Sequence, residues 1–133
     1  MRYMLDTNIC IYLIRRQPPQ VLRRLEALNE GDVCMSVITY AELRAGLEIQ
    51  SDQREHDQCV LAQLVQRIPV LPLDEAGAES YGRLRAAVRD RRRDALDRLI
   101  AAQAVAAGSI LITNNEADFA DYPDLQVENW VKD

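Results

Sequence analysis

Four acidic residues lie where short apolar segments end or where expected helices begin. Asp6 directly follows Tyr3-Met4-Leu5, and Asp118 lies just beyond the most apolar run of the chain. Glu42 comes soon after a second apolar run, and Asp97 lies at the start of an expected helix. Because the carboxyl ends of parallel strands share one edge of a sheet, we expect these acids to converge in one cleft.

Each acid also has a simpler explanation as a helix cap or as an acid in a first helical turn, where the helix dipole favours negative charge. Asp6 directly precedes a helical pattern, and capping-like patterns occur at Thr39-x-x-Glu42, Asp94-x-x-Asp97 and Asn115-x-x-Asp118. Taken singly, each acid is better explained as a cap. Taken together, the carboxylates would raise one another's pKa values unless a cation lay among them.

The four acids together predict a hard divalent cation. Oxygen ligands without histidine or cysteine favour Mg²⁺ or Mn²⁺, and we expect one or two ions bound by Asp6, Glu42, Asp97 and Asp118. Two ions about 4 Å apart activate a water and stabilise the leaving oxygen in phosphodiester hydrolysis. The residues expected to orient the acids or to contact phosphate are Thr7, Asn8, Ser36, Thr39, Thr113 and Asn115.

Apolar periodicity predicts the elements that position these residues. Strands are expected at Tyr3–Leu5, Val33–Met35, Ser109–Ile112 and Leu125–Val127, with an edge strand or extended connection at the proline-containing segment Ile68–Leu73. Helices are expected after Thr7, over Val21–Leu28, from Thr39, around Val60–Val65, from Asp74 to about Arg91, and over Leu96–Ala107. This alternation predicts an α/β fold with a parallel β-sheet of four to five strands flanked by helices on both faces. The length predicts a single domain over residues 1–133.

The net charge of −5 argues against nonspecific wrapping of nucleic acid, which depends on neutralising phosphates. Arginines are nevertheless concentrated in places. Those at Arg15, Arg16, Arg91, Arg92 and Arg93 are candidate RNA contacts that would form a basic rim around the acidic centre. The alternative is that each arginine solvates a helix face and pairs with a neighbouring carboxylate.

Cysteine content and hydropathy bound the setting in which the protein works. Three widely spaced cysteines and one histidine predict neither a disulfide framework nor a zinc site. No secretory signal and no apolar stretch of membrane-spanning length is visible in the sequence. We therefore expect a cytoplasmic protein with no membrane partner.

A series of motifs extends along nearly the whole chain. They are Leu5-Asp6-Thr7-Asn8, Ser36 to Leu43, Asp97 with Leu99-Ile100-Ala101-Ala102, Thr113-Asn114-Asn115 with Phe119, and Val127-Glu128-Asn129-Trp130. In this order they resemble the PIN-domain family, and within it the VapC-type toxins of bacterial toxin–antitoxin pairs. The set is specific, although Asp-Thr-Asn alone would be a weak signal.

The resemblance implies a PIN-like fold and a Mg²⁺- or Mn²⁺-dependent endoribonuclease whose acidic positions fall on Asp6, Glu42, Asp97 and Asp118. It also implies a homodimer held inactive by a cognate VapB-like antitoxin, whose tail occupies the cleft, often with an arginine or lysine. Members of the most similar subgroup resemble enzymes that cut initiator tRNA in the anticodon loop, which makes tRNA a candidate among RNA substrates.

The chain departs from the family pattern at two places. Relatives commonly carry a Pro-Ile-Gly-like stretch before the third acid, where this chain has the segment from Arg91 to Leu96. Without that glycine, the two helices that flank the segment are expected to join more rigidly. Asn115 stands where many relatives have aspartate, so the fourth carboxylate falls on Asp118 and a second ion should bind more weakly.

Two other functions compete with the nuclease. A Mg²⁺-dependent phosphohydrolase could use Asp6 as its nucleophile, but Asn8 stands where the second acid of an Asp-x-Asp arrangement would be. A non-catalytic binding module would use the acids only as helix caps. The five glycines are scattered, which disfavours a nucleotide-binding loop.

Overall fold

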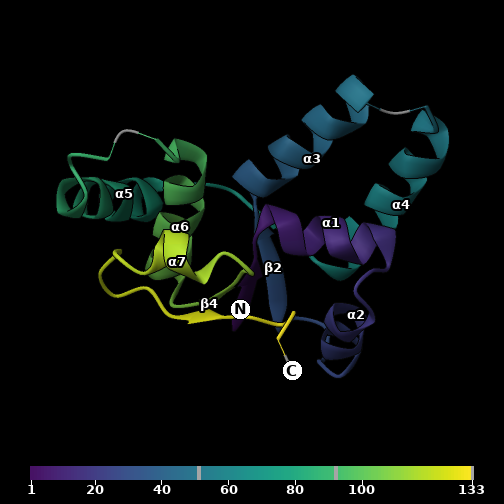
Figure 1. Cartoon of the computed structure of the whole chain (residues 1–133), viewed down its shortest axis with the longest axis horizontal. Helices are drawn as coiled ribbons and strands as arrows, with labels where there is room; N and C mark the ends of the chain where they lie inside the picture. The colour runs from purple at the N-terminus through teal and green to yellow at the C-terminus, as the bar shows by residue number, and fades with distance from the viewer. Residues whose placement is uncertain (51, 92, 133) are drawn as a thin grey trace.

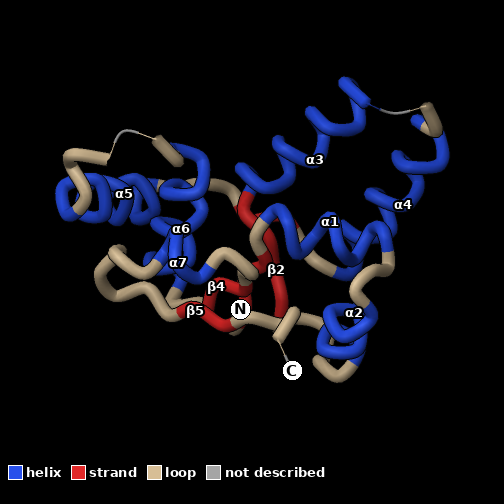
Figure 2. The backbone as a smooth tube through the Cα atoms, viewed as in Figure 1, coloured by secondary structure: helices blue, strands red, loops and turns tan. Residues whose placement is uncertain are grey.

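The structure, a computed structural model, describes residues 1–50, 52–91 and 93–132, and these ranges contain a five-stranded sheet (Figures 1 and 2). Its strands are β1 (Tyr3–Leu5), β2 (Val33–Ser36), β3 (Val70–Leu71), β4 (Ile110–Ile112) and β5 (Val127–Glu128). They lie in the order β3-β2-β1-β4-β5, and every neighbouring pair is parallel. The predicted parallel α/β sheet is confirmed.

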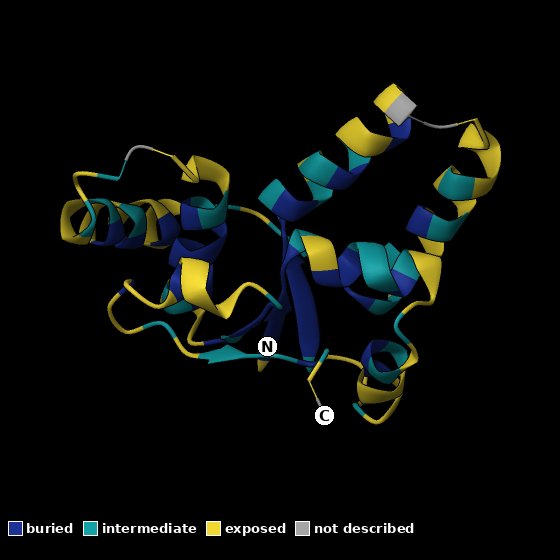
Figure 3. Ribbon diagram, viewed as in Figure 1, coloured by how far each residue is buried: buried dark blue, intermediate teal, exposed yellow. Residues whose placement is uncertain are grey.

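Helices cover both faces of this sheet, as predicted. They are α1 (Thr7–Arg15), α2 (Pro19–Glu26), α3 (Val37–Gln50), α4 (Arg54–Arg67), α5 (Glu75–Ala87), α6 (Ala95–Ala107) and α7 (Glu116–Phe119). One hydrophobic cluster takes side chains from α1 to α4, and a second takes them from α5, α6 and α7. Figure 3 shows the central strands β1 and β2 buried between these two groups of helices, whereas β5 at the edge of the sheet is only partly buried.

The central strand shows why two cores form. All three residues of β1 are buried, but successive side chains of a strand point to opposite faces. Tyr3 and Leu5 accordingly pack with α1 to α4, whereas Met4 packs with α5, α6 and α7. A strand buried on both faces is continuously apolar, which is the pattern visible in the sequence.

β3 is an edge strand, as its two prolines predicted. It pairs with β2 alone, and the backbone N–H of Met35 donates to the carbonyl of Pro69 at 2.9 Å. A proline cannot donate to a neighbouring strand, so Pro69 and Pro72 are tolerated on either side of this two-residue strand.

The prediction that Thr39 caps the third helix is wrong. α3 begins at Val37, directly after β2, and the hydroxyl of Ser36 accepts from the backbone N–H of Ile38 at 2.9 Å. Thr39 is fully buried inside the helix. The strand runs straight into the helix, so the helix has already begun two residues before the apparent capping box.

Three other boundaries differ from the predictions. α2 begins at Pro19 rather than Val21, because proline is favoured in the first turn of a helix. α5 ends at Ala87 rather than near Arg91, because the chain turns and the N–H of Arg91 bonds to the carbonyl of Val88. The last strand covers Val127–Glu128 rather than Leu125–Val127, because Val127 and Glu128 are the residues that pair with Leu111 and Ile112 of β4.

The strand order makes the carboxyl edge of the sheet at β1 the expected place for a ligand. β1 lies between β2 and β4, so the strand order reverses on either side of it, and ligands of open α/β sheets bind at such points. The backbone N–H of Asp6 donates to the carbonyl of Ile112 at 3.0 Å, which fixes Asp6 at this edge.

No helix within residues 1–50, 52–91 and 93–132 has the length and apolar character that crossing a membrane requires.

Candidate functional site

Asp6 is a helix cap and also belongs to an acidic cluster. Its carboxylate accepts from the N–H of Ile9 at 3.0 Å, so it is the N-cap of α1. Its side chain is 5% exposed and takes a hydrogen bond from the side chain of Thr113. Burial, followed by the negative charges of Asp97 and Glu42, raises the pKa of Asp6 to about 6. Capping alone therefore does not account for its environment.

Glu42 is held by the first residue of α1. The hydroxyl of Thr7 donates to a carboxylate oxygen of Glu42 at 2.6 Å, and the hydroxyl oxygens of Thr7 and Thr39 are 3.4 Å apart. α1 and α3 pack against each other, which brings this threonine and this glutamate together from positions far apart in the sequence. Thr7 thus orients Glu42, whereas Thr39 contacts Thr7 and not the acid.

Asp97 links the other acids electrostatically. It lies partly exposed in the first turn of α6, and its pKa is raised by burial and then by the charges of Glu42, Asp94 and Asp118. Asp118 is exposed on α7. The structure therefore brings Asp6, Glu42 and Asp97 within electrostatic reach of one another, and Asp118 approaches the group from the side of Asp97.

The remaining supporting residues differ in burial and in the groups that they contact. Thr113 is buried and accepts from the N–H of Asn115 at 3.0 Å, so its hydroxyl can donate to Asp6. Asn8 and Asn115 are exposed at the starts of α1 and α7. Ser36 points elsewhere, because its hydroxyl donates to the buried side chain of Gln103 at 2.7 Å.

Gln103 is a structural residue that sequence reasoning missed. Its amide also donates to the carbonyls of Leu71 and Pro72, each at 3.0 Å, which ties α6 to the end of β3. The signal was present, since a glutamine in the alanine-rich apolar face of α6 needs a buried partner. Asn114 was also missed, and its amide donates to the hydroxyl of Tyr12 at 2.8 Å.

The arginines predicted to contact RNA differ in their surroundings. Arg15 and Arg16 are exposed at the end of α1, and Arg93 is exposed before α6. Arg91 is partly buried and contacts other groups of the protein, including Asp121 at 3.5 Å. Arg92 lies outside the described residues.

The donor chemistry fits a hard cation, but the acids do not form a finished cage. Within the described ranges, no group of three or more histidine, cysteine, aspartate or glutamate side chains is arranged to hold a metal ion. Mutual repulsion among Asp6, Glu42 and Asp97 is the expected reason, and Thr7 draws the carboxylate of Glu42 to itself. Mg²⁺ keeps several waters and needs only one or two carboxylates, so this arrangement suits it.

A cavity of about 310 Å³ lies beside Glu42. It is formed by α1, α3 and α4, which Figure 1 shows as a group apart from α5, α6 and α7. Its lining combines apolar and charged side chains and consists of Ile11, Ile14, Arg15, Glu42, Leu43, Gly46, Leu47, Asp57 and Leu61.

Comparison with known proteins agrees with this geometry. The chain matches the family model of the PIN domain over residues 3–125. It is 38% identical to a tRNA(fMet)-specific endonuclease VapC of Shigella flexneri over 98% of both chains. It is 37% identical to a ribonuclease VapC2 of Haemophilus influenzae over 98% of this chain and 99% of that protein. The crystal structure of VapBC2 from Rickettsia felis bound to a promoter DNA fragment aligns with a TM-score of 0.88 and 34% identity, covering 98% of this chain and 99% of that chain.

Proposed function

This chain belongs to the PIN-domain family, and from that premise we propose that it is a metal-dependent endoribonuclease, the toxin of a VapBC-type toxin–antitoxin pair. The observation that carries the proposal is the approach of Asp6, Glu42 and Asp97 at the carboxyl edge of the sheet. Relatives that cover nearly the whole chain are named ribonucleases, so the nuclease is preferred to the two alternatives. Asp6 is 5% exposed, which also disfavours its use as the nucleophile of a phosphohydrolase.

The proposed metal ligands are Asp6, Glu42, Asp97 and Asp118. Bound Mg²⁺ or Mn²⁺ would supply an activated water and stabilise the leaving oxygen of the cleaved phosphodiester. Thr7 orients Glu42, and Thr113 together with the N–H of Ile9 orients Asp6. Burial and the neighbouring negative charges disfavour the ionised form of Asp6 and so raise its pKa. A divalent cation bound beside Asp6 would stabilise that ionised form.

We propose RNA as the substrate, and initiator tRNA as the first RNA to test, because the Shigella flexneri relative is named for tRNA(fMet). The exposed side chains of Asn8 and Asn115 lie at helix N-termini, where backbone N–H groups favour phosphate oxygens. Arg15, Arg16 and Arg93 are exposed cations that could contact RNA on either side of the acids. We also propose the cytoplasm as the site of action, because the proposed substrate is a cytoplasmic RNA.

The proposed partner is a VapB-like antitoxin that fills the cavity between α1, α3 and α4. The apolar part of the cavity would accept apolar side chains, and Glu42 in its lining would attract an arginine or lysine of the antitoxin. An antitoxin seated there would cover one of the acids and so block cleavage. We further propose that the chain forms a single domain over residues 1–133 and assembles as a homodimer.

The experiment that tests the function is cleavage of purified RNA. The protein is incubated with total RNA and with initiator tRNA in Mn²⁺, in Mg²⁺ and in a chelator, and the fragment ends are mapped. We expect discrete, metal-dependent cuts by the wild type, and none by Asp6→Asn or Glu42→Gln at the same protein concentration. If both variants still cut RNA as the wild type does, the cuts come from a contaminating nuclease, and the proposed function loses its support.

A further inference from the structure

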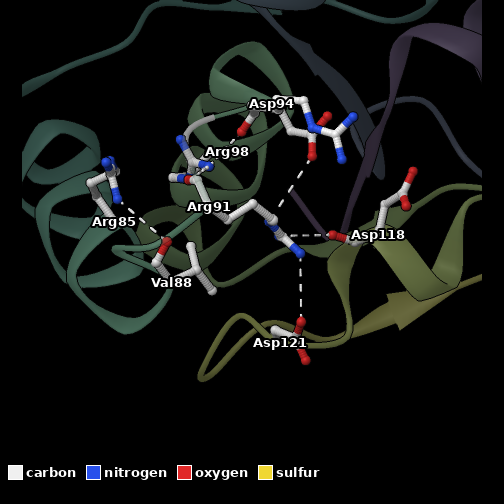
Figure 4. A network of polar contacts seen from close by, with 8 residues as sticks. Arg85, Val88, Arg91, Asp94, Arg98, Asp118 and Asp121 are labelled. Atoms are coloured by element: carbon white, nitrogen blue, oxygen red, sulfur yellow. Dashed lines mark hydrogen bonds and ion pairs between the residues drawn. The ribbon is translucent and has the colours of Figure 1, made fainter.

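We propose that Arg91 is a positioning residue that holds the first turn of α6 and the short helix α7 in a fixed relation, and with them Asp97 and Asp118. The inference rests on the proposed function, because it concerns acids assigned there as metal ligands. It gives Arg91 a role different from the RNA contact predicted from the sequence. Figure 4 shows its guanidinium between Asp94, Asp118 and Asp121.

On one side, Arg91 binds α7 and the turn that follows it. Its Nη2 donates to the backbone carbonyl of Asp118 at 3.2 Å, and its Nη1 lies 3.5 Å from a carboxylate oxygen of Asp121. The guanidinium carbon lies 5.0 Å from the ring centroid of Tyr122, which is itself buried. These three contacts come from one short stretch of chain, so one side chain fixes its position.

On the other side, Arg91 is tied to the start of α6. Its Nε lies 4.0 Å from a carboxylate oxygen of Asp94. The side chain of Arg98, which is 1% exposed, donates to the backbone carbonyls of Arg91 and Arg93 at 2.9 and 2.6 Å. Arg98 therefore anchors the backbone of Arg91 to α6 while the guanidinium of Arg91 reaches across to α7.

The first turn of α6 and the short helix α7 both lack a side-chain cap, so contacts such as those of Arg91 help to fix them. Asp94 precedes α6 with a φ of 67° and makes no capping hydrogen bond. Asn115 precedes α7 and makes none either, and α7 is only four residues long. Short helices without caps are marginal, so contacts with other elements must fix their position.

Arg91 does this without neutralising the acid it positions. Its hydrogen bond goes to the backbone carbonyl of Asp118, and Figure 4 shows the carboxylate of Asp118 pointing away from the guanidinium. The carboxylate of Asp118 thus stays available to a cation. An arginine fits this role because its planar fork donates in several directions at once.

The test compares Arg91→Ala and Arg91→Lys with Arg89→Ala, because Arg89 is a nearby exposed arginine in the turn just after α5. Mn²⁺ affinity is measured by electron paramagnetic resonance on the RNA-free protein, and kcat and KM are measured on RNA. Substituting residues that orient metal ligands typically costs tenfold or more in metal affinity or activity. We expect Arg91→Ala and Arg91→Lys to weaken Mn²⁺ binding about tenfold and to lower kcat with little change in KM, and Arg89→Ala to match the wild type.

Each other outcome overturns one specific part of the proposal. If Arg91→Ala binds Mn²⁺ and turns over like Arg89→Ala, Arg91 does not position the acids. If Arg91→Ala raises KM and flattens the salt dependence of RNA binding at unchanged kcat, Arg91 is an RNA contact. If the wild type neither binds Mn²⁺ nor cleaves RNA, the proposed function itself has failed.

A second variant keeps the test informative if Arg91→Ala does not fold. Arg91→Gln retains an amide donor and the stem beside Tyr122 but loses the charge and the fork. Its metal-free melting temperature is compared with that of the wild type by circular dichroism. A folded Arg91→Gln with wild-type Mn²⁺ affinity would also overturn the proposal.

Discussion

The hydroxyl of Thr7 donates to the carboxylate of Glu42 across 2.6 Å, between the first turn of α1 and the middle of α3. This contact joins two helices that extend from neighbouring strands of the sheet. It also decides which way the Glu42 carboxylate points, so Thr7 should matter to the chemistry although it carries no charge.

Replacing Thr7 with valine removes the hydroxyl but keeps the shape of the side chain, and should therefore impair cleavage. We expect Thr7→Val to lower the rate about 10- to 100-fold, because Glu42 loses the donor that orients it. Thr7→Ser keeps the hydroxyl and should stay near the wild type. The measurement is single-turnover RNA cleavage in Mn²⁺, and equal rates for valine and serine variants would contradict the role of this hydrogen bond.

Asp6→Asn should separate a metal ligand from a helix cap. Asparagine is as good an N-cap as aspartate, so the hydrogen bond from Ile9 can be kept while the buried charge is removed. We expect the metal-free variant to melt at or above the wild-type temperature near neutral pH. It should also lose the stabilisation that Mg²⁺ gives the wild type, about 2.7 kcal/mol at a hundredfold excess over the dissociation constant.

The control for that experiment is the wild type itself. Its melting temperature should rise with millimolar Mg²⁺ or Mn²⁺. A wild type that is indifferent to both ions would favour the binding-module alternative, in which the acids only cap helices.

The raised pKa of Asp6 predicts a pH dependence of metal-free stability. The folded-state pKa is about 6 against an ordinary value of 3.8, so between these values the folded protein holds a proton that the unfolded chain has released. The contribution of Asp6 to the free energy of unfolding therefore falls as pH rises from about 4 to 6, by about 3 kcal/mol at most. Urea titrations of wild type and Asp6→Asn over this pH range, in chelator, isolate this contribution, and parallel curves would show that the pKa of Asp6 is not raised.

Filling the cavity at Gly46 should weaken antitoxin binding. A Cβ at Gly46 meets no atom within 4 Å and Gly46 lines the cavity, so we expect the side chain of Gly46→Leu to occupy part of the cavity and to stabilise α3 slightly. We expect at least tenfold weaker binding of a co-expressed VapB-like antitoxin, measured by titration calorimetry, with an equal or higher melting temperature. Gly82→Leu in α5, also free of close contacts, is the matched control and should bind normally.

The exposed arginines should carry the salt dependence of RNA binding. Arg16 has a φ of 58°, so Arg16→Asn removes its charge with a residue that tolerates this backbone conformation. In an Asp6→Asn background, which prevents cleavage, we expect the slope of log K against log salt to decrease in magnitude by about 0.7 to 0.9. Arg54 is the first residue of α4 and is paired with Glu48 of α3, so Arg54→Gln should leave the slope unchanged.

Much of this protein was determined by its sequence alone. Local periodicity and capping preferences predict features that depend on neighbouring residues. Examples are the run from Tyr3 into Asp6 and α1, the edge strand between two prolines, the start of α5 at Asp74 and the end of α6 at Ala107. The acidic motifs likewise indicate the family by their residue types and their order along the chain.

The tertiary structure decided which of these residues meet. Contacts between separate elements of the chain decide three relationships. Thr7 holds Glu42, Ser36 bonds to Gln103, and Arg91 joins α6 to α7. The same is true of α3, which starts at Val37 because β2 leads straight into it. Such contacts are set by how helices pack on a shared sheet, and no pattern of adjacent residues encodes those distances.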